Sequence, residues 1–350
     1  MRLSLFPFMP EVQTLARNRS LLTEHEIVSV ISFKQDAARM QVFARETGIP
    51  CTTSVEEGLQ RADCLVLLRP PFSVPDWQKY GACIDCAARR GIAVHAGRGL
   101  IDELPEEHDR ARVHPIQNAA PLARAGARLE LRSISTPVIA VAGLGENCGK
   151  FECQLELKRY LDGLGYRCTA LCSNPLGVYA GMELLPDFLF DAAVAFPEKV
   201  IGLNRYVDAL CREQDPDVLL IGVPGGVMPL SGRDTNFFLE LPLVVSSALR
   251  IDEGVLTVYH IDGPLGFLDM LTKLCRERFS VPVGAFYMAR QVATFDPDTE
   301  SMQFLFLSDA YIAAHSAAIP ADSRIALPLQ EHSHVYKKVV ENLQENLETV

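Results

Sequence analysis

The chain has 350 residues, a formal net charge of −11 and a hydrophobic content of 48%. That length predicts about two domains, and the hydrophobic content is enough for a large buried core. The acidic balance argues against nonspecific binding to nucleic acid or to a membrane surface. The absence of a long basic run in the sequence supports the same conclusion.

No apolar stretch approaches the roughly 18 residues that a membrane-spanning helix needs, so no transmembrane segment is expected. The first residues, Met1-Arg-Leu-Ser-Leu-Phe, are too short and too mixed for a signal peptide. We therefore expect a cytoplasmic protein.

Residues 1–100 alternate strand and helix patterns, which predicts a parallel sheet with helices on its faces. The expected strands are Leu3–Phe8, Ile27–Ser32, Pro50–Thr53, Cys64–Leu68 and Ile92–His95. The expected helices are Glu11–Leu22, Asp36–Thr47, Val55–Arg61 and Tyr80–Arg90.

This first unit is Rossmann-like in pattern but lacks the dinucleotide fingerprint. No glycine occurs in the run Phe6-Pro-Phe-Met-Pro10 that follows the first strand, so binding of NAD or FAD is not expected. Arg69 follows a later strand and could bind an anion, although a solvated loop arginine is the preferred interpretation.

Residues 101–136 read as a connecting segment, with one further strand expected at Arg128–Arg132. We place the domain boundary near residue 135. The prediction is an α/β protein with a Rossmann-like domain over 1–135 and a P-loop NTPase-like domain, of mostly parallel sheet, over 136–350.

The second domain repeats the alternation. Its expected strands are Val138–Ala142, Arg167–Cys172, Val218–Val223, Val255–Tyr259, Val281–Met288 and Gln303–Leu307. Its expected helices are Glu152–Gly163, Leu203–Gln214, Leu265–Phe279 and His334–Leu347. The last helix has a single apolar face, which would pack on the body or on a second subunit in a homodimer.

The run from Val141 to Phe151, V-A-G-L-G-E-N-C-G-K-F, is a near match to a phosphate-binding loop between a strand and a helix. Small residues let backbone N–H groups converge on phosphate, the helix N-terminus adds its dipole, and Lys150 supplies a cation. Phe151 stands where a P-loop has a magnesium-binding hydroxyl, so phosphate binding is expected and hydrolysis is in doubt.

A second glycine motif follows the Val218–Val223 strand, with Gly225 and Gly226 placed to approach a γ-phosphate closely. The competing interpretation is a plain tight turn. Arg233, a little further on, could clamp a phosphate or carboxylate, against the alternative of a surface salt bridge. The predicted nucleotide-binding residues are Gly143, Gly145, Glu146, Asn147, Cys148, Gly149, Lys150, Phe151, Glu152, Gly225, Gly226 and Arg233.

Several acidic or basic residues are candidates for chemistry. Glu183 and Asp187 could bind magnesium, and Glu183 could act as a general base, although a solvated acidic loop is as good an interpretation. His260 and Asp262 follow a strand on the ligand side of the sheet, where a histidine could move a proton. Lys150, Glu183 and His260 are the predicted catalytic residues.

The ten cysteines are scattered. Cys83 and Cys86 form the single C-x-x-C, which lacks the second pair that a zinc site needs, so buried free thiols are expected. Cys148 could be a reactive thiolate at a helix N-terminus, but a small loop residue is the preferred interpretation. A metal cluster at a dimer interface stays an open alternative.

The two glycine motifs resemble those of the dethiobiotin synthetase and cobyric-acid synthetase branch of P-loop proteins. Gly225, Gly226, Pro229 and Leu230 match that family's E-G-A-G-G-x-x-x-P-L pattern, and the likeness covers about half the chain. Gly222 stands where the family has glutamate, which removes a second expected magnesium ligand. The resemblance implies binding of ATP or GTP, with magnesium in question.

A further resemblance spans nearly the whole chain. The Rossmann-like first half, the Cys-Gly-Lys-Phe loop end, and Ser173-Asn-Pro175 before a Met-Glu-x-x-Pro-x-Phe segment are similar to a peptide maturation system protein family of clostridial-type bacteria. It implies a role in making a ribosomal peptide product, with a precursor peptide or radical maturase as partner. The function expected is nucleotide-dependent activation of a carboxylate; the alternative is a non-catalytic nucleotide- or anion-binding scaffold.

Overall fold

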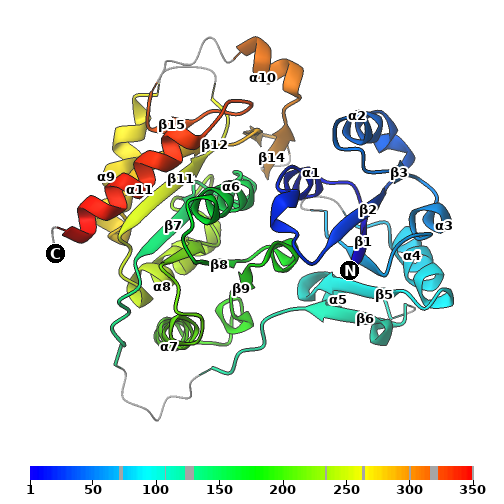
Figure 1. Ribbon diagram of the computed structural model, residues 1–350, viewed down its shortest axis with the longest axis horizontal. Helices are drawn as coiled ribbons and strands as arrows, with labels where there is room; N and C mark the ends of the chain where they lie inside the picture. The colour runs from blue at the N-terminus through cyan, green and yellow to red at the C-terminus, as the bar shows by residue number, and fades with distance from the viewer. Residues whose placement is uncertain are drawn as a thin grey trace. The chain divides into compact units, whose positions relative to one another are not determined.

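The structure, a computed structural model, describes residues 1–70, 74–106, 108–122, 130–232, 235–261, 265–298, 301–315 and 322–348 (Figure 1). It divides into two compact units. The first comprises Met1–Asn118 with Asn174–Leu184, and the second comprises Ala119–Ser173 with Leu185–Val350. The boundary predicted near residue 135 lies in the segment between strands β6 and β7.

The first unit contains a six-stranded parallel sheet, in the order β3-β2-β1-β4-β5-β6 along the described residues. Its strands are β1 (Arg2–Phe6), β2 (Glu26–Ile31), β3 (Cys51–Thr52), β4 (Cys64–Leu67), β5 (Ala93–Gly97) and β6 (Val113–Ile116). Its α-helices are α1 (Pro10–Arg17), α2 (Ala37–Thr47), α3 (Val55–Gly58), α4 (Trp77–Arg89) and α5 (Arg98–Glu103). Short 3-10 helices are η1 (Arg19–Leu21), η2 (Lys34–Asp36), η3 (Arg110–Arg112) and η4 (Pro175–Ala180).

Local sequence accounts for where these helices begin and end. The hydroxyl of Ser54 accepts a hydrogen bond from the N–H of Glu57 at the start of α3. The carboxylate of Asp76 does the same for Lys79 at the start of α4. Both residues satisfy an N–H group that the first helical turn leaves unpaired. Gly48 ends α2 in a left-handed conformation that glycine adopts at little cost.

The second sheet has seven strands in the described residues, in the order β15-β12-β11-β7-β10-β8-β9. They are β7 (Val138–Gly143), β8 (Cys168–Cys172), β9 (Glu183–Leu184), β10 (Val218–Gly222), β11 (Glu253–Val258), β12 (Val283–Met288) and β15 (Ile325–Ala326). The strands from β15 to β8 pair in parallel. Between β12 and β15 the chain forms an antiparallel hairpin, β13 (Gln291–Asp296) with β14 (Ser301–Phe306).

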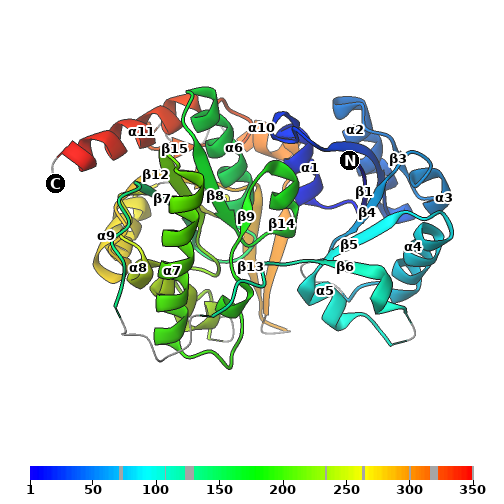
Figure 2. The ribbon, with the colours of Figure 1, turned by 60° about the horizontal axis from the view of Figure 1, so that its bottom comes forward.

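Helices cover both faces of this sheet (Figure 2). The helices of this unit are α6 (Lys150–Gly163), α7 (Phe196–Gln214), α8 (Glu240–Ala248), α9 (Phe267–Phe279), α10 (Asp309–His315) and α11 (Ser333–Glu348), with the 3-10 helices η5 (Asp187–Leu189) and η6 (Asn236–Leu239). Helices α7, α8 and α9 share one core with alternate residues of the central strands, while α6 and α11 pack against other strand residues and each other. Because both faces are covered, β7 is buried along its whole length and reads as a continuous apolar run.

The predicted fold class is confirmed: the protein is α/β, with two large and mostly parallel sheets. The strand expected at Gln303–Leu307 is β14, which pairs in an antiparallel hairpin and not in the parallel sheet. The strand expected at Arg128–Arg132 is wrong for residues 130–132, which have no regular structure, and its other residues lie outside the description. No described helix is long and apolar enough to cross a membrane.

Candidate phosphate-binding site

The glycine-lysine loop, Gly143–Lys150, joins the end of β7 to the start of α6, as the sequence predicts. Two of its residues have left-handed backbones, with φ of 53° at Asn147 and 81° at Gly149. Backbones of this kind can turn successive N–H groups toward one side, as anion-binding loops do. Helix α6 begins at Lys150, so its positive dipole end lies at the end of the loop.

Lys150 links the two glycine motifs. Its ammonium Nζ donates to the carbonyl of Gly145, at 2.6 Å, and to the carbonyl of Gly225, at 2.7 Å. The backbone N–H of Val227 donates to the carbonyl of Gly143, at 2.9 Å. The structure therefore brings the loop and the later Gly225–Gly226 turn together around one cation.

Gly226 is required by this close approach. A Cβ atom at that position would lie 2.4 Å from the carbonyl oxygen of Leu144 and 2.6 Å from the Cα of Gly145. Both are backbone atoms that cannot move aside without distorting the loop. A plain tight turn does not require this close approach. The second glycine motif differs from one because it packs directly on the loop.

Cys148 is fully buried beneath the loop. Its Sγ lies 2.9 Å from the carbonyl of Gly145, to which the thiol can donate, and 2.9 Å from the hydroxyl of Thr257. A Cβ atom on Gly143 would lie 2.4 Å from the same sulfur. This burial favours the interpretation of Cys148 as a small packing residue and gives no access for a reactive thiolate.

Two residues that sequence reasoning missed hold the loop in place. The phenol of Tyr259, just beyond β11, donates to the carbonyl of Glu146 at 2.6 Å. The amide of Asn236 donates to the carbonyls of Leu144, at 3.3 Å, and Met228, at 2.5 Å. Asn236 also starts four successive residues with positive φ, Asn236–Leu239, directly before α8.

Gln154 fills the space beside Gly222. Its amide Nε2 donates to the carbonyl of Leu171 at 2.8 Å, and the side chain is buried. A Cβ atom on Gly222 would lie 2.2 Å from the Oε1 of Gln154. A glutamate at this position, which the resembled family has, would require the Gln154 side chain to move.

Phe151 and Glu152 lie on the first turn of α6 and are partly buried. The carboxylate of Glu152 is hydrogen-bonded to the phenol of Tyr287 in β12. Burial raises the pKa of Tyr287, and the nearby carboxylates of Glu152 and Glu156 raise it further. Tyr287 therefore stays neutral and acts as a donor to α6.

The predicted acids are placed on separate elements. Glu183 lies in β9 and Asp187 begins η5, with Pro186 between them, so the two do not share a helix. His260 is buried just beyond β11, where its backbone N–H donates to the carbonyl of Gln291 at 2.8 Å. Arg233, Asp234 and Asp262 lie outside the described residues. The roles of Glu183, Asp187 and His260 stay predictions.

The cysteine pair of the first unit lies on α4. Cys83 and Cys86 are both buried free thiols, and burial raises the pKa of Cys83 to about 12. Across the described residues, no group of three or more His, Cys, Asp or Glu side chains is arranged to hold a metal ion.

Arg69 pairs with Glu103 at 2.8 Å, and both side chains are exposed. This placement agrees with the interpretation of Arg69 as a solvated loop arginine.

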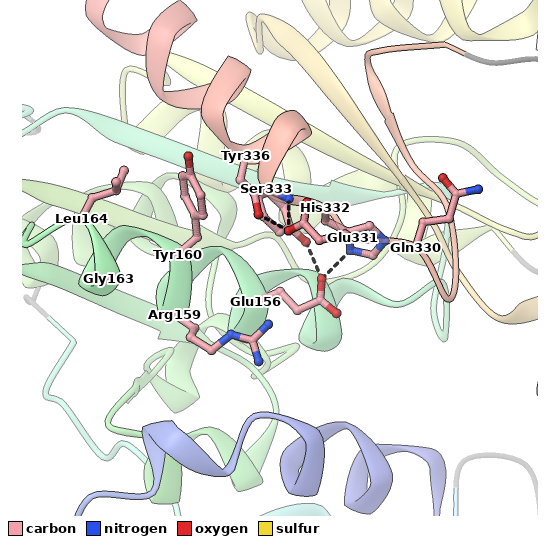
Figure 3. Close-up of a pocket in the computed structure, with 10 residues that line it drawn as sticks. All are labelled: Glu156, Arg159, Tyr160, Gly163, Leu164, Gln330, Glu331, His332, Ser333 and Tyr336. Carbon is pink, nitrogen blue, oxygen red and sulfur yellow. Dashed lines mark hydrogen bonds and ion pairs between the residues drawn. The ribbon is translucent and has the colours of Figure 1, made fainter.

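A groove of about 540 Å³ lies between α6 and α11 (Figure 3). Its lining includes no residue of the glycine-lysine loop. At its floor the carboxylate of Glu156 lies 2.7 Å from the Nδ1 of His332 and accepts from the phenol of Tyr336, also at 2.7 Å (Figure 3). The Nε2 of His332 lies 2.7 Å from the carbonyl of Leu327, which can only accept. His332 thus has acceptors on both ring nitrogens, as a protonated imidazolium needs.

The chain is similar over its length to a solved DUF1611 family protein from Anabaena variabilis ATCC 29413. The two are 17% identical, the match covers 98% of each chain, and the TM-score is 0.58. A nucleotide-binding protein from Archaeoglobus fulgidus in complex with ADP is 14% identical over 59% of this chain and 88% of that one, with a TM-score of 0.30. The signal recognition particle receptor FtsY from Elizabethkingia anophelis is 14% identical over 80% of this chain and 82% of that one, with a TM-score of 0.28.

The first of these likenesses shows the fold of the chain. The other two, at their low TM-scores, carry no argument of their own. No protein-family model and no curated protein matches the chain. The function must therefore be argued from the residues of the site.

Proposed function

We propose that the second unit binds the phosphates of a purine nucleotide, ATP or GTP, at the glycine-lysine loop. The observation that carries the proposal is the position of Lys150, whose ammonium lies between the carbonyls of Gly145 and Gly225. Both of these partners are neutral carbonyls and neither is a carboxylate. A phosphate above the loop would accept from this group and from the loop N–H groups together.

Two uses of the bound nucleotide remain to be separated. In the first, Lys150 stabilises a transferred phosphoryl group while the protein activates a carboxylate, in the maturation of a ribosomal peptide with a precursor or maturase as partner. In the second, the nucleotide is a structural or regulatory ligand of a non-catalytic scaffold. The second use is favoured by Phe151 in place of a hydroxyl residue and by the Gln154 side chain beside Gly222.

Calorimetric titration with ATP and GTP, each with and without magnesium, tests the binding. Lys150→Ala removes the ammonium and should raise the Kd roughly 10- to 100-fold, the range for a charge-assisted hydrogen bond. Lys273→Ala is the matched control, because that lysine is 74% exposed on α9 and pairs only weakly with Glu277. It should leave the Kd unchanged.

The outcomes decide between the uses. Binding that requires magnesium, together with release of phosphate, supports phosphoryl transfer with substitute metal ligands. Binding that ignores magnesium and releases no phosphate supports the scaffold. If wild-type protein binds neither nucleotide, or if Lys150→Ala binds as tightly as wild type, the proposed function is wrong.

A further inference from the structure

Arg290 is a buried cation whose chain neighbour, Ala289, lies beside Gly149 of the glycine-lysine loop. It follows β12 at the carboxyl end of the parallel strands, the edge of an open α/β sheet where ligands bind. Only 3% of the residue is exposed. Placing a guanidinium in such surroundings costs several kcal/mol unless an anion balances it.

The chain places this arginine close to the phosphate site. A Cβ atom on Gly149 would lie 3.1 Å from the Cβ of Ala289 and 3.5 Å from its Cα. Consecutive Cα atoms are about 3.8 Å apart, so the Cα of Arg290 lies within roughly 7 Å of that point. An extended arginine side chain is comparable in length, so a guanidinium turned away from Asp309 toward the start of α6 would reach an anion bound there.

The anion that now balances Arg290 belongs to α10. Arg290 forms an ion pair with Asp309, the first residue of that helix. Its guanidinium also lies 5.2 Å from the ring centre of Phe306 in β14. The Asp309 side chain is 51% exposed, so water can take over its solvation if the pair opens. The arginine has no such option, because it is buried.

Helix α10 has one further ring contact to the strand ends. Tyr311 packs at 6.4 Å, edge to face, on His260 beyond β11. The segment from Arg290 to α10 therefore attaches beside the loop through an ion pair and an aromatic contact. Loss of the ion pair would weaken the hold on the whole helix.

We propose that Arg290 is an anion-binding residue of the nucleotide site, and that Asp309 occupies it when nucleotide is absent. A nucleotide phosphate then competes with the Asp309 carboxylate for the same guanidinium, and nucleotide binding loosens α10. This inference rests on the proposed function, since it assigns a second cation to the same ligand. Asp309 is the exchangeable partner because its carboxylate reaches water.

The two members of the pair should change nucleotide affinity in opposite directions. Arg290→Gln removes a charge-assisted contact and should raise the Kd for ATP roughly 10- to 100-fold. Asp309→Asn removes the competitor and should lower the Kd by up to about fivefold, the range for a partly exposed ion pair. Arg290→Lys keeps the charge but loses the planar fork and should fall between wild type and Arg290→Gln.

Matched controls are available in the same unit. Arg278 lies 5.9 Å from the ring centre of Phe279 but is exposed on α9, so Arg278→Gln tests the loss of an arginine over a phenylalanine. Asp298 is an exposed carboxylate of the β13–β14 connection, so Asp298→Asn tests the loss of an acidic charge. Neither should change the Kd. The melting temperature of each variant shows whether it is folded.

Titrations with ATP, ADP, AMP and inorganic phosphate locate the contact. For each ligand, the affinity of wild type is divided by that of Arg290→Lys. If this ratio changes when one phosphate is removed from the ligand, the guanidinium contacts that phosphate. If the ion pair only anchors α10, Arg290→Gln and Asp309→Asn should both lower the melting temperature. The Kd should then stay unchanged in both variants or move in the same direction in both. Either result, with wild-type protein still binding ATP, overturns the role of Arg290 and leaves the proposed function standing. If neither wild type nor Asp309→Asn binds ATP or GTP, both proposals fail.

Discussion

The amide oxygen of Gln154 lies 2.2 Å from the point where a side chain on Gly222 would begin. Gln154 comes from the first turns of α6, and Gly222 is the last residue of β10. The helix that follows the glycine-lysine loop therefore occupies the space beside Gly222, the position at which the resembled pattern has glutamate. Any side chain at position 222 therefore requires the Gln154 side chain to move.

This relationship predicts the stability of Gly222→Ala. The added methyl group must displace Gln154 and break its hydrogen bond to the carbonyl of Leu171, which should lower the free energy of unfolding by about 1–3 kcal/mol. Urea denaturation measures this change. Gly163→Ala is the matched control, because a Cβ atom there meets nothing within 4 Å, and it should be neutral or stabilising.

The clash with Gln154 is isolated by a double variant. Gln154→Ala alone should also destabilise, because it leaves the buried carbonyl of Leu171 without that donor. In its background, Gly222→Ala should cost less than in wild type, since the obstructing amide is gone. Equal costs in both backgrounds would mean that the two side chains do not compete for the space.

The sequence predicts those parts of the site that are continuous in the chain. The glycine-lysine loop has its signal within a few residues, because small residues, the lysine and the apolar strand before them are neighbours. Tyr259 and Asn236 contact the same loop from 113 and 92 residues away. A lone tyrosine or asparagine at a strand or helix end has many ordinary uses, so only the folded chain assigns them.

Missed elements of the fold have local physical causes. Strand β6, Val113–Ile116, contains Pro115, and a proline argues against a strand unless it lies at a sheet edge, as β6 does. The sequence does not predict β13 and places β14 in the parallel sheet, although the short connection between the two strands permits only antiparallel pairing. Helix α8 has a weak periodicity because residues around much of its circumference are apolar.

Gly149 should be intolerant of a side chain for two separable reasons. Its φ of 81° costs an alanine about 1–2 kcal/mol, and the new Cβ would lie 3.1 Å from both Ala289 and Tyr287. Gly165 has the same kind of backbone, with φ of 88°, but open space around it. Gly149→Ala should therefore destabilise more than Gly165→Ala.

Nucleotide titration of the two alanine variants separates strain from function. Gly165→Ala should bind ATP as wild type does, since it lies beyond the far end of α6. Gly149→Ala should bind more weakly, because a shifted loop misdirects its N–H groups. Equal affinity of both variants would show that the loop geometry is not used for the ligand.

His332 should make stability depend on pH. Burial alone would lower the pKa of His332, but the hydrogen bond and charge of Glu156 outweigh burial and raise it above 6.5. A base with a raised pKa stabilises the folded state below the unfolded pKa, and this contribution is lost as pH rises through the folded pKa. The melting temperature should therefore decline as pH is increased above about 6.5.

His332→Gln should remove that decline. Glutamine can still donate to Glu156 but cannot become charged, so the part of the pH dependence that comes from the imidazole disappears. His334→Gln is the control, because His334 is exposed in the first turn of α11, two residues beyond His332, and its replacement should leave the profile unchanged. A profile for His332→Gln that matches wild type would show that this ion pair contributes nothing to stability.

Glu253 should contribute a second pH dependence of the same sign. It lies in β11, is 1% exposed, and accepts from the N–H of Gly284 at 2.9 Å. Burial raises the pKa of Glu253 from 4.5 to about 8, against the smaller opposing effect of its hydrogen bonds. Between these two values the folded chain holds a proton that the unfolded chain releases, so stability decreases as pH rises.

Glu253→Gln keeps an acceptor for Gly284 and removes the ionisation. The variant should match wild type near pH 5 and exceed its melting temperature by a few degrees near pH 9, because it has no buried charge to form. Glu341→Gln, at an exposed position of α11, should show no such crossover. Combined with His332→Gln, the variant should flatten most of the profile above pH 6, since the two groups titrate on separate elements of the same unit. A Glu253→Gln variant that is less stable than wild type at both ends of the range would mean that the carboxylate is paired and charged in the folded protein.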